Sequence, residues 1–504
     1  MAKMSKVARA SVILMIGTIL SKGLGFAREL MVAYRFGAGS ISDAFVLTNS
    51  IPTLIFVSVA TAININFIPY YHRIDVEDDR NRFTSNLTNI SIIILFIGCL
   101  VINIFPRQVL KIFATGLPEE TERYAILMLR IVVFSIIPII LSHLYQAYLQ
   151  ANESFASTAV YGIITNIAVI LFTYIATDEK YYVLSVGTIV SHAVGLIPIF
   201  YSIKKKTSFH YCPYIDFRDQ RIKDLVLLTL PLMVEDLASS MSLLVDRNLA
   251  SFLDKGTISG LGYAGTIGNI ASTMIASAIM TATFPLFSKM LANGEKAQFE
   301  KQFEKYASII SYLLGPISVF MVLNAGDIVT FIFEHGAFNS TATRIVSESM
   351  ICYSLGVLPM GLQSYLIRGF YAMQDTKTPV KIKVLALICN IVLNLLSVRW
   401  LKHMGIALST SISYVIAYGL LTYNIKKKHG IQNIWRLAIE GGLSLLISLI
   451  PAVTIFIIFN NILTLRNLFL KLFFEGVLFV IGYIMMIMLF RKDRFNEVIK
   501  VLKR

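Results

Sequence analysis

Two cations and an acid lie within the first apolar stretch of the chain. The segment SKGLGFAREL places Lys22, Arg28 and Glu29 inside an apolar run from about residue 8 to residue 36, which is long enough to cross a bilayer. An ionisable group that faces lipid costs about 2.5–3.5 kcal/mol on insertion scales, so such groups usually face a bundle interior or a water-filled cavity. On a helix Lys22 and Glu29 share one face, and Arg28 lies about 100° from Glu29. The pattern predicts a polar site inside a membrane protein.

Gly23 and Gly25 separate these charges. Each lowers helix stability by about 1 kcal/mol relative to alanine. A helix that bends as a gate moves tolerates this cost, and close packing against the second helix explains the glycines equally well. Both interpretations stay open from sequence alone.

A polar stripe follows in the apolar segment 224–250. Glu235, Ser239, Ser242 and Asp246 recur at helical spacing and so lie on one face. Such a stripe is typical of a helix that lines a cavity. Glu235 is therefore a candidate substrate-binding residue.

Asp246 also belongs to a candidate cation site. Asn390 and Asn394 are four residues apart on one predicted helix, and Thr410 lies early in the next. Carboxylate, amide and hydroxyl oxygens are ligands for a hard cation such as Na⁺, if they converge. The alternative is that the amides hydrogen-bond across helices and hold the bundle together.

The composition of the chain indicates a membrane protein. The 504 residues are 56% hydrophobic and only 15% charged, far more apolar than a soluble globular domain. Windows of about 20 apolar residues, the length that crosses the hydrocarbon core, recur from end to end. They predict an all-α polytopic protein with fourteen transmembrane helices, near 9–35, 43–69, 86–105, 124–148, 156–176, 182–203, 224–250, 257–288, 306–324, 342–369, 383–398, 404–425, 438–460 and 467–490.

The net charge of +15 is explained by the way in which the chain crosses the membrane. With the N-terminus in the cytoplasm, most Lys and Arg residues outside the spans fall in cytoplasmic segments, as the positive-inside rule requires. Both termini are then cytoplasmic. The basic balance indicates attraction to anionic lipid, and we expect no nucleic-acid partner.

The chain repeats itself. RELMVAYRFGAGSIS (28–42) matches VDRNLASFLDKGTIS (245–259), and three later matches keep the same order with a slowly drifting offset. Two homologous six-helix lobes are predicted, residues 1–222 and 223–430, with helices 13 and 14 and a basic tail in 431–504. The repeats run parallel. Such two-lobed folds place a substrate site between the lobes and work by alternating access.

Three segments carry a family resemblance: SKGLGFARELMVAYRFGAGSISDAF, GFYAMQDTKTPVKI and EHGAFNSTAT. They closely resemble the MurJ (MviN) family of lipid II flippases, in the multidrug/oligosaccharidyl-lipid/polysaccharide exporter superfamily. The resemblance implies that the protein flips an undecaprenyl-pyrophosphate-linked cell-wall precursor to the outer leaflet of the bacterial cytoplasmic membrane, for peptidoglycan synthesis and cell shape. It also implies a cationic cavity between two lobes and a lipid-tail groove at helices 13 and 14.

The resemblance assigns residues by position. Lys22 and Arg28 match a basic pair of the family, Glu29 matches the following acid, and Asp43 matches the acid after the GAG turn. Cations that replace the hydration of a pyrophosphate suit this cargo, because arginine can bind two phosphate oxygens at once. Sodium coupling in the family favours a cation role for Asp246 and its three candidate partners.

Two basic positions of the family are absent here, since the chain has Phe56 and Thr266 where many members have arginine. The cargo is therefore either lipid II or another polyprenyl-linked oligosaccharide, such as a capsule, teichoic or surface-polysaccharide unit. A cation-coupled drug antiporter is a further alternative, since it shares the superfamily fold. An enzyme is not expected, because the longest polar breaks lack a catalytic or metal-binding arrangement. We expect a monomer.

Two smaller charged groups complete the candidates. Arg368 and Asp375 flank the cytoplasmic end of segment 342–369, where they form an inward gate or cap the turn. Lys471 and Glu475 are four residues apart and are expected to pair with each other. A lipid-contact role for them in the groove is the alternative.

Overall fold

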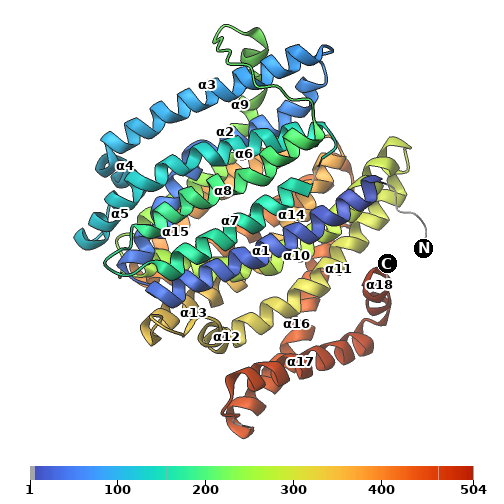
Figure 1. The fold of residues 1–504 in the computed structure, drawn as a ribbon. Helices are drawn as coiled ribbons and strands as arrows, with labels where there is room; N and C mark the ends of the chain where they lie inside the picture. Colours follow the sequence, from blue (N-terminus) through green and yellow to red (C-terminus); the bar gives the residue numbers. More distant parts are fainter. Residues whose placement is uncertain (1–5, 155, 464, 503–504) are drawn as a thin grey trace. The chain divides into compact units, whose positions relative to one another are not determined.

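The computed structural model describes residues 6–154, 156–463 and 465–502 (Figure 1). Side chains are not described at 6–15, 57–65, 156, 228–239, 432–433 and 500–502. Every regular element in the described part is helical. The chain divides into two compact units, of which one is Met1–Ser259 with Gly336–Phe338 and the other is Gly260–His335 with Asn339–Arg504.

In its described residues, the first unit holds nine α-helices. They are α1 (Lys6–Phe36), α2 (Ser40–Tyr71), α3 (Glu77–Ile104), α4 (Pro106–Phe113), α5 (Glu119–Val132), α6 (Ile136–Ala151), α7 (Ala156–Ile175), α8 (Val183–Lys206) and α9 (Gln220–Ala250). A 3₁₀ turn joins α5 to α6. Pro106 opens α4, where the missing amide hydrogen costs nothing. The core between α2 and α5 is apolar, with Leu47, Ile51 and Met128 fully buried.

The second unit holds most of α10 and the helices that follow it. They are α10 (Thr257–Ala292), α11 (Lys296–Leu323), α12 (Ala325–Phe333), α13 (Ser340–Ser354), α14 (Val357–Ala372), α15 (Lys377–Asn424), α16 (Arg436–Ile457), α17 (Leu468–Phe490) and α18 (Lys492–Leu502). The α15 element joins two predicted helices, and it breaks at Lys402, whose φ of 47° lies in the left-handed region. The break falls in the predicted gap between 398 and 404.

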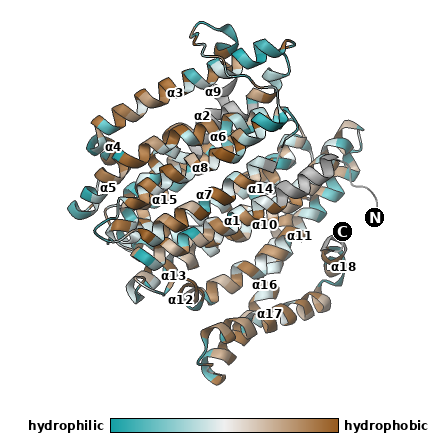
Figure 2. Ribbon diagram, in the orientation of Figure 1, coloured by the Kyte–Doolittle hydropathy of each residue, from teal (hydrophilic) through white to brown (hydrophobic). Residues whose placement is uncertain are grey.

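The helices have the length and composition of membrane spans. Within the described residues, nine helical segments are long and apolar enough to cross a membrane, and α13 with α14, bent by 47°, makes a tenth if the pair is one span. All fourteen predicted segments fall on helices, and the all-α membrane fold is confirmed. The number fourteen stays a prediction. Figure 2 shows hydrophobic colour along much of α3, α5 and α17 and hydrophilic colour in the loop after α8.

The order of helices follows the predicted repeat. A short helix, α4 or α12, comes directly after α3 or α11, and an interrupted pair follows in each case. Pro138 and Pro359 lie early in the second helices of these pairs, α6 and α14. The compact units divide after α9, because α9 packs against α2. The lobe boundaries at 222 and 430 remain predictions about the repeat.

The first helix packs against α7 (Figure 1). Gly17 lies against Ala159, Ser21 against Gly162, and the Cβ position of Gly25 is 3.7 Å from Asn166 Oδ1. Positions 17, 21 and 25 form one stripe of small residues, which lets two helix backbones approach closely. Gly25 therefore packs against α7 rather than against the second helix.

Filling this interface should destabilise the protein. A side chain at Gly162 would overlap Ser21, so we expect Gly162→Leu to cost about 1–3 kcal/mol and to lower the Tm of the purified protein. Gly23→Ala is the matched control, since nothing lies within 4 Å of its Cβ position, and its Tm should equal or exceed that of the wild type. Equal Tm values for the wild type and Gly162→Leu would contradict the close contact.

Candidate substrate and gating site

The charges of α1 lie on an unbroken helix. Lys22 is exposed and, within the described part of the chain, has no hydrogen-bond or ion-pair partner. The Arg28 side chain is 39% exposed, and its Nη2 lies 3.9 Å from Glu29 Oε1. Because α1 is continuous here, Lys22 and Glu29 share a face as predicted. The helix runs through Gly23 and Gly25 without a break, and their gating role stays a prediction.

A polar cluster on α7 and α8 lies beside Arg28. Tyr161 OH and His192 Nδ1 are 2.7 Å apart, and Arg28 and His143 are both within electrostatic range of the His192 ring. Asn166 Nδ2 donates to the Ser21 carbonyl of α1 at 3.2 Å. Sequence reasoning missed this cluster. The signal was two histidines within predicted spans, where ionisable groups are usually functional.

Asp43 is buried at the start of α2, at the end of the unit predicted to face outside. Its Oδ2 accepts the Gly256 amide at 2.7 Å, and its Oδ1 accepts the Ser259 amide at 2.7 Å and the Ser259 hydroxyl at 2.6 Å. Both oxygens are therefore engaged by the chain itself. In this conformation Asp43 holds a turn, and its role toward a substrate stays a prediction.

A second contact joins the same region, because the Ala337 amide donates to the Tyr34 carbonyl at 2.8 Å. We call residues 34–43, 256–259 and 336–338 the outer clasp. Gly256 and Gly336 have φ of 86° and 63°, and a Cβ on either would overlap a backbone carbonyl of residue 38 or 34. Only glycine permits this close approach without strain.

The candidate cation ligands are partly brought together. Asn390 Nδ2 donates to Thr410 Oγ1 at 3.3 Å, and Asn394 Nδ2 donates to Asn390 Oδ1 at 3.2 Å. Both asparagines are buried. Asp246 is also buried but belongs to the other compact unit. Glu235 lies outside the residues whose side chains are described.

The two absent basic positions have local roles. Phe56 packs against the apolar core of the first unit, close to Gly98 of α3. The Thr266 hydroxyl donates to the Gly262 carbonyl of its own helix at 2.9 Å. Neither residue supplies a positive charge.

Asp375 caps the start of α15 in this structure, and the gating role of Arg368 and Asp375 stays a prediction. Arg368 is exposed, and no contact between it and Asp375 is present in the described part of the chain. Asp375 Oδ1 accepts the Thr378 amide at 3.0 Å, its Oδ2 accepts the Thr378 hydroxyl at 2.5 Å, and Lys428 Nζ lies 3.6 Å away. Asp375 thus satisfies an open amide at the start of α15.

This cap predicts a pH-dependent stability. Burial raises the pKa of Asp375, but the Thr378 bonds and Lys428 outweigh burial and leave the pKa below its usual value of 3.8. The stabilisation is then complete above the usual pKa and is lost as pH falls through the lowered one. Asp375→Ala should cost about 0.5–2 kcal/mol at pH 7. The Tm difference from the wild type should shrink in acid, and a constant difference would contradict the assignment.

The predicted ion pair of Lys471 and Glu475 is present, but it is not the nearest contact of Lys471. Lys471 Nζ lies 4.0 Å from Glu475 Oε1 but only 2.7 Å from Asp327 Oδ2 of α12. The expected pairing along the helix is therefore the weaker contact of Lys471. The reason is tertiary, since α12 packs against α17 and supplies a nearer carboxylate.

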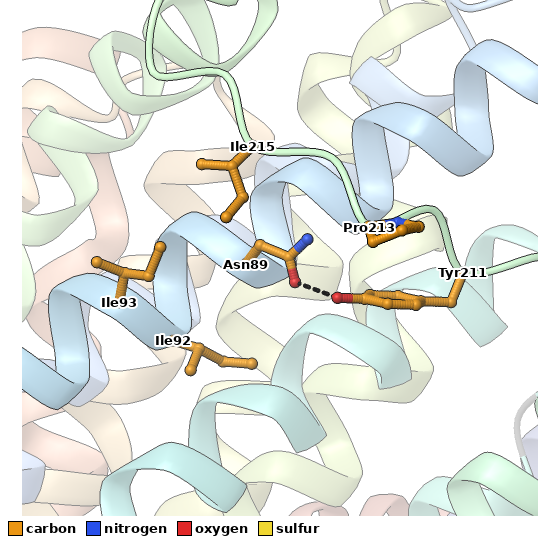
Figure 3. Close-up of a pocket in the computed structure, with 6 residues that line it drawn as sticks. All are labelled: Asn89, Ile92, Ile93, Tyr211, Pro213 and Ile215. Carbon is orange, nitrogen blue, oxygen red and sulfur yellow. Dashed lines mark hydrogen bonds between the residues drawn. The ribbon is translucent and has the colours of Figure 1, made fainter.

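A shallow pocket lies where the loop after α8 crosses α3 (Figure 3). Tyr211 OH donates to Asn89 Oδ1 at 2.8 Å, and Asn89 Nδ2 donates to the Tyr214 carbonyl at 3.0 Å. Ile92, Ile93 and Ile215 make much of the remaining wall. None of the lining residues is charged, so the pocket does not suit a phosphate.

Comparison with known families identifies the family of the chain. A family model described as "Lipid II flippase MurJ" matches residues 32–496. The chain belongs to this family. It is a multi-pass membrane protein, and membership of the MurJ family places it in the bacterial inner membrane.

Relatives in the MurJ family match along most of their length. A "Probable lipid II flippase MurJ" of Rickettsia prowazekii is 27% identical over 445 residues, 87% of this chain and 86% of that protein. A "Lipid II flippase MurJ" of Burkholderia cenocepacia is 25% identical and covers 82% of each chain.

Solved structures share the fold. "Lipid II flippase MurJ, inward closed conformation" matches with a TM-score of 0.81 at 23% identity, over 96% of this chain and 99% of that one. An inward-facing multidrug resistance transporter of the MATE family matches with a TM-score of 0.70 at 13% identity, over 84% and 98%. The chain therefore shares its fold with both of these structures.

Proposed function

We propose that the protein moves lipid II from the inner to the outer leaflet of the cytoplasmic membrane by alternating access, without changing it chemically. Membership of the family and the retained basic pair of α1 support this proposal. The observation that carries the proposal concerns Lys22, which lies within a predicted span. Its side chain is exposed and forms no ion pair with the described residues. Such a group is available to an anionic cargo.

The cations of α1 have different parts in this proposal. Lys22 offers a point charge, whereas Arg28 can bind two oxygens of the pyrophosphate. Glu29, 3.9 Å from Arg28, is close enough to compete for the guanidinium once the cargo leaves. Asp43 acts at the outer clasp, because its oxygens are already engaged there. Release to the outside requires these bonds to break.

Na⁺ is the proposed coupling ion. Asn390, Asn394 and Thr410 already lie together and supply the amide and hydroxyl oxygens that such an ion prefers. Asp246 would add the carboxylate. Replacement of Asn390 by alanine should reduce the dependence of transport on Na⁺, and an unchanged dependence would leave the amides as packing groups.

The alternative cargo is another polyprenyl-linked oligosaccharide. Phe56 and Thr266 favour it, because both replace arginines that are frequent in the family and thereby reduce the positive charge. A drug antiporter is less well supported, since its likeness is one of fold alone. We further propose a monomer with both termini in the cytoplasm.

Complementation tests the function. Cells depleted of their own lipid II flippase should grow with normal shape when they express this protein. Restored growth supports lipid II as cargo. Failure at normal membrane levels, together with restored export of a surface polysaccharide in cells lacking that exporter, would favour the second cargo.

A further inference from the structure

A buried carboxyl group on α17 accepts no hydrogen bond from the residues that the structure describes. Glu475 of α17 is 1% exposed. Among the residues that the structure describes, neither of its oxygens accepts a hydrogen bond. The nearest described cation, Lys471, is 4.0 Å away and is shared.

Lys471 is held by two other groups. Its Nζ donates to Asp327 Oδ2 at 2.7 Å and to Asn460 Oδ1 at 2.6 Å. Exposure falls in steps along this cluster, since Asn460 is exposed, Asp327 is 31% exposed and Lys471 is 11% exposed. The cluster therefore runs from an exposed end at Asn460 to Lys471, which lies one helical turn before Glu475 on α17.

The surroundings of Glu475 do not compensate its charge. Phe320 of α11 stacks on Phe479, which lies one helical turn after Glu475 on α17, and the Cβ position of Gly476 is 3.9 Å from Phe320. Residues 313–323 of α11 and 441–457 of α16 contain no ionisable side chain, and α12 contributes only Asp327. An ionised Glu475 would leave the cluster with one net negative charge, which is costly to bury in a membrane protein.

A proton suits this place better than a metal ion. A bound cation needs several oxygen ligands, but Asp327 Oδ2 and Asn460 Oδ1 already accept from Lys471. The ammonium at 4.0 Å would also repel a second cation. One proton on Glu475 makes the cluster neutral.

We propose that Glu475 is an exchangeable proton-binding site, and that Lys471 changes partner with its charge. When the carboxyl O–H bond breaks, the proton passes to water at the Asn460 end and Lys471 moves from Asp327 to the new carboxylate. Reprotonation reverses both steps. Asp327 lies on α12, which runs directly into residues 334–338 and so into the outer clasp. The site thus links proton binding to the segment that carries Ala337, whichever cargo is transported.

Infrared spectroscopy of the purified full-length protein tests the site. The wild type should show the C=O stretching band of a buried carboxylic acid, which disappears as pH rises. Glu475→Gln should lack this band, and Glu475→Asp should shift it. Glu440→Gln is the matched control, because Glu440 is also buried but is bound by Arg491, Arg494 and Tyr312. It should keep the band.

Lys471→Met tests whether Lys471 stabilises the ionised form of Glu475. Without the ammonium the ionised carboxylate loses its only new partner, so the band should persist to higher pH by about one unit or more. Three results would overturn the proposal: a wild type without the band at any pH, a band that is the same in Glu475→Gln, or a band that vanishes on adding Na⁺ at constant pH. The last would identify a cation site. If Glu475→Gln does not fold, the comparison of the band between the wild type and Glu475→Asp decides whether Glu475 carries the proton.

Discussion

Arg28→Ala should abolish growth of flippase-depleted cells that depend on this protein, at normal membrane levels of the variant. Each charge-assisted hydrogen bond to phosphate is worth about 1.5–3 kcal/mol, so losing a two-bond contact weakens cargo binding by about 100-fold or more. The nearby polar groups, Tyr161 and His192, do not replace a guanidinium. Colony formation on depletion medium, with immunoblotting of membranes, measures the effect.

Arg28→Lys separates charge from geometry. Lysine keeps the positive charge but cannot bind two oxygens in one plane, so partial growth is expected. Arg107→Ala is the control, because Arg107 forms an exposed ion pair with Glu122 in the same unit, and it should grow normally. Full rescue by Arg28→Ala would refute the role of this residue.

The second large effect is expected at the outer clasp. Asp43→Ala removes the acceptor of two backbone amides and one hydroxyl. Each buried donor that is left open costs about 1–3 kcal/mol, so the closed clasp should lose at least tenfold in population. Hydrogen exchange of the Gly256 and Ser259 amides measures this directly, and both should exchange faster in the variant.

Ser40→Ala provides the comparison for the clasp. The Ser40 hydroxyl donates to Glu120 at 3.2 Å in an exposed setting near the same turn, so its loss should leave the exchange of both amides unchanged. Equal exchange in Asp43→Ala and the wild type would show that the carboxylate does not hold the clasp closed. In that case a direct role of Asp43 toward cargo would be favoured.

The helices were predictable because their signal is local. Apolar windows reveal each span, and even the break at Lys402 falls in the gap between two predicted helices. The short helices α4 and α12 were not predicted, since eight or nine residues are too few for a membrane window. The amphipathic pattern of so short a segment is weak evidence for a helix when the surface against which it packs is unknown.

The contacts of the site were less predictable because they are tertiary. Asp43 could be singled out only through resemblance, and its partners lie 213 and 216 residues away. Helical spacing paired Lys471 with Glu475, yet α12 supplied a nearer partner. Spacing along one helix states which residues share a face, but it does not state what another helix brings to that face.

The most direct test follows a labelled lipid II molecule across the bilayer. Vesicles containing the purified protein and fluorescent lipid II in both leaflets are treated with a quencher that reaches only the outer leaflet. We expect the wild type and Arg107→Ala to make the whole lipid pool accessible, and Arg28→Ala to leave the inner pool protected. Equal transfer by the wild type and Arg28→Ala would contradict the account, as would protection of the inner pool by the wild type.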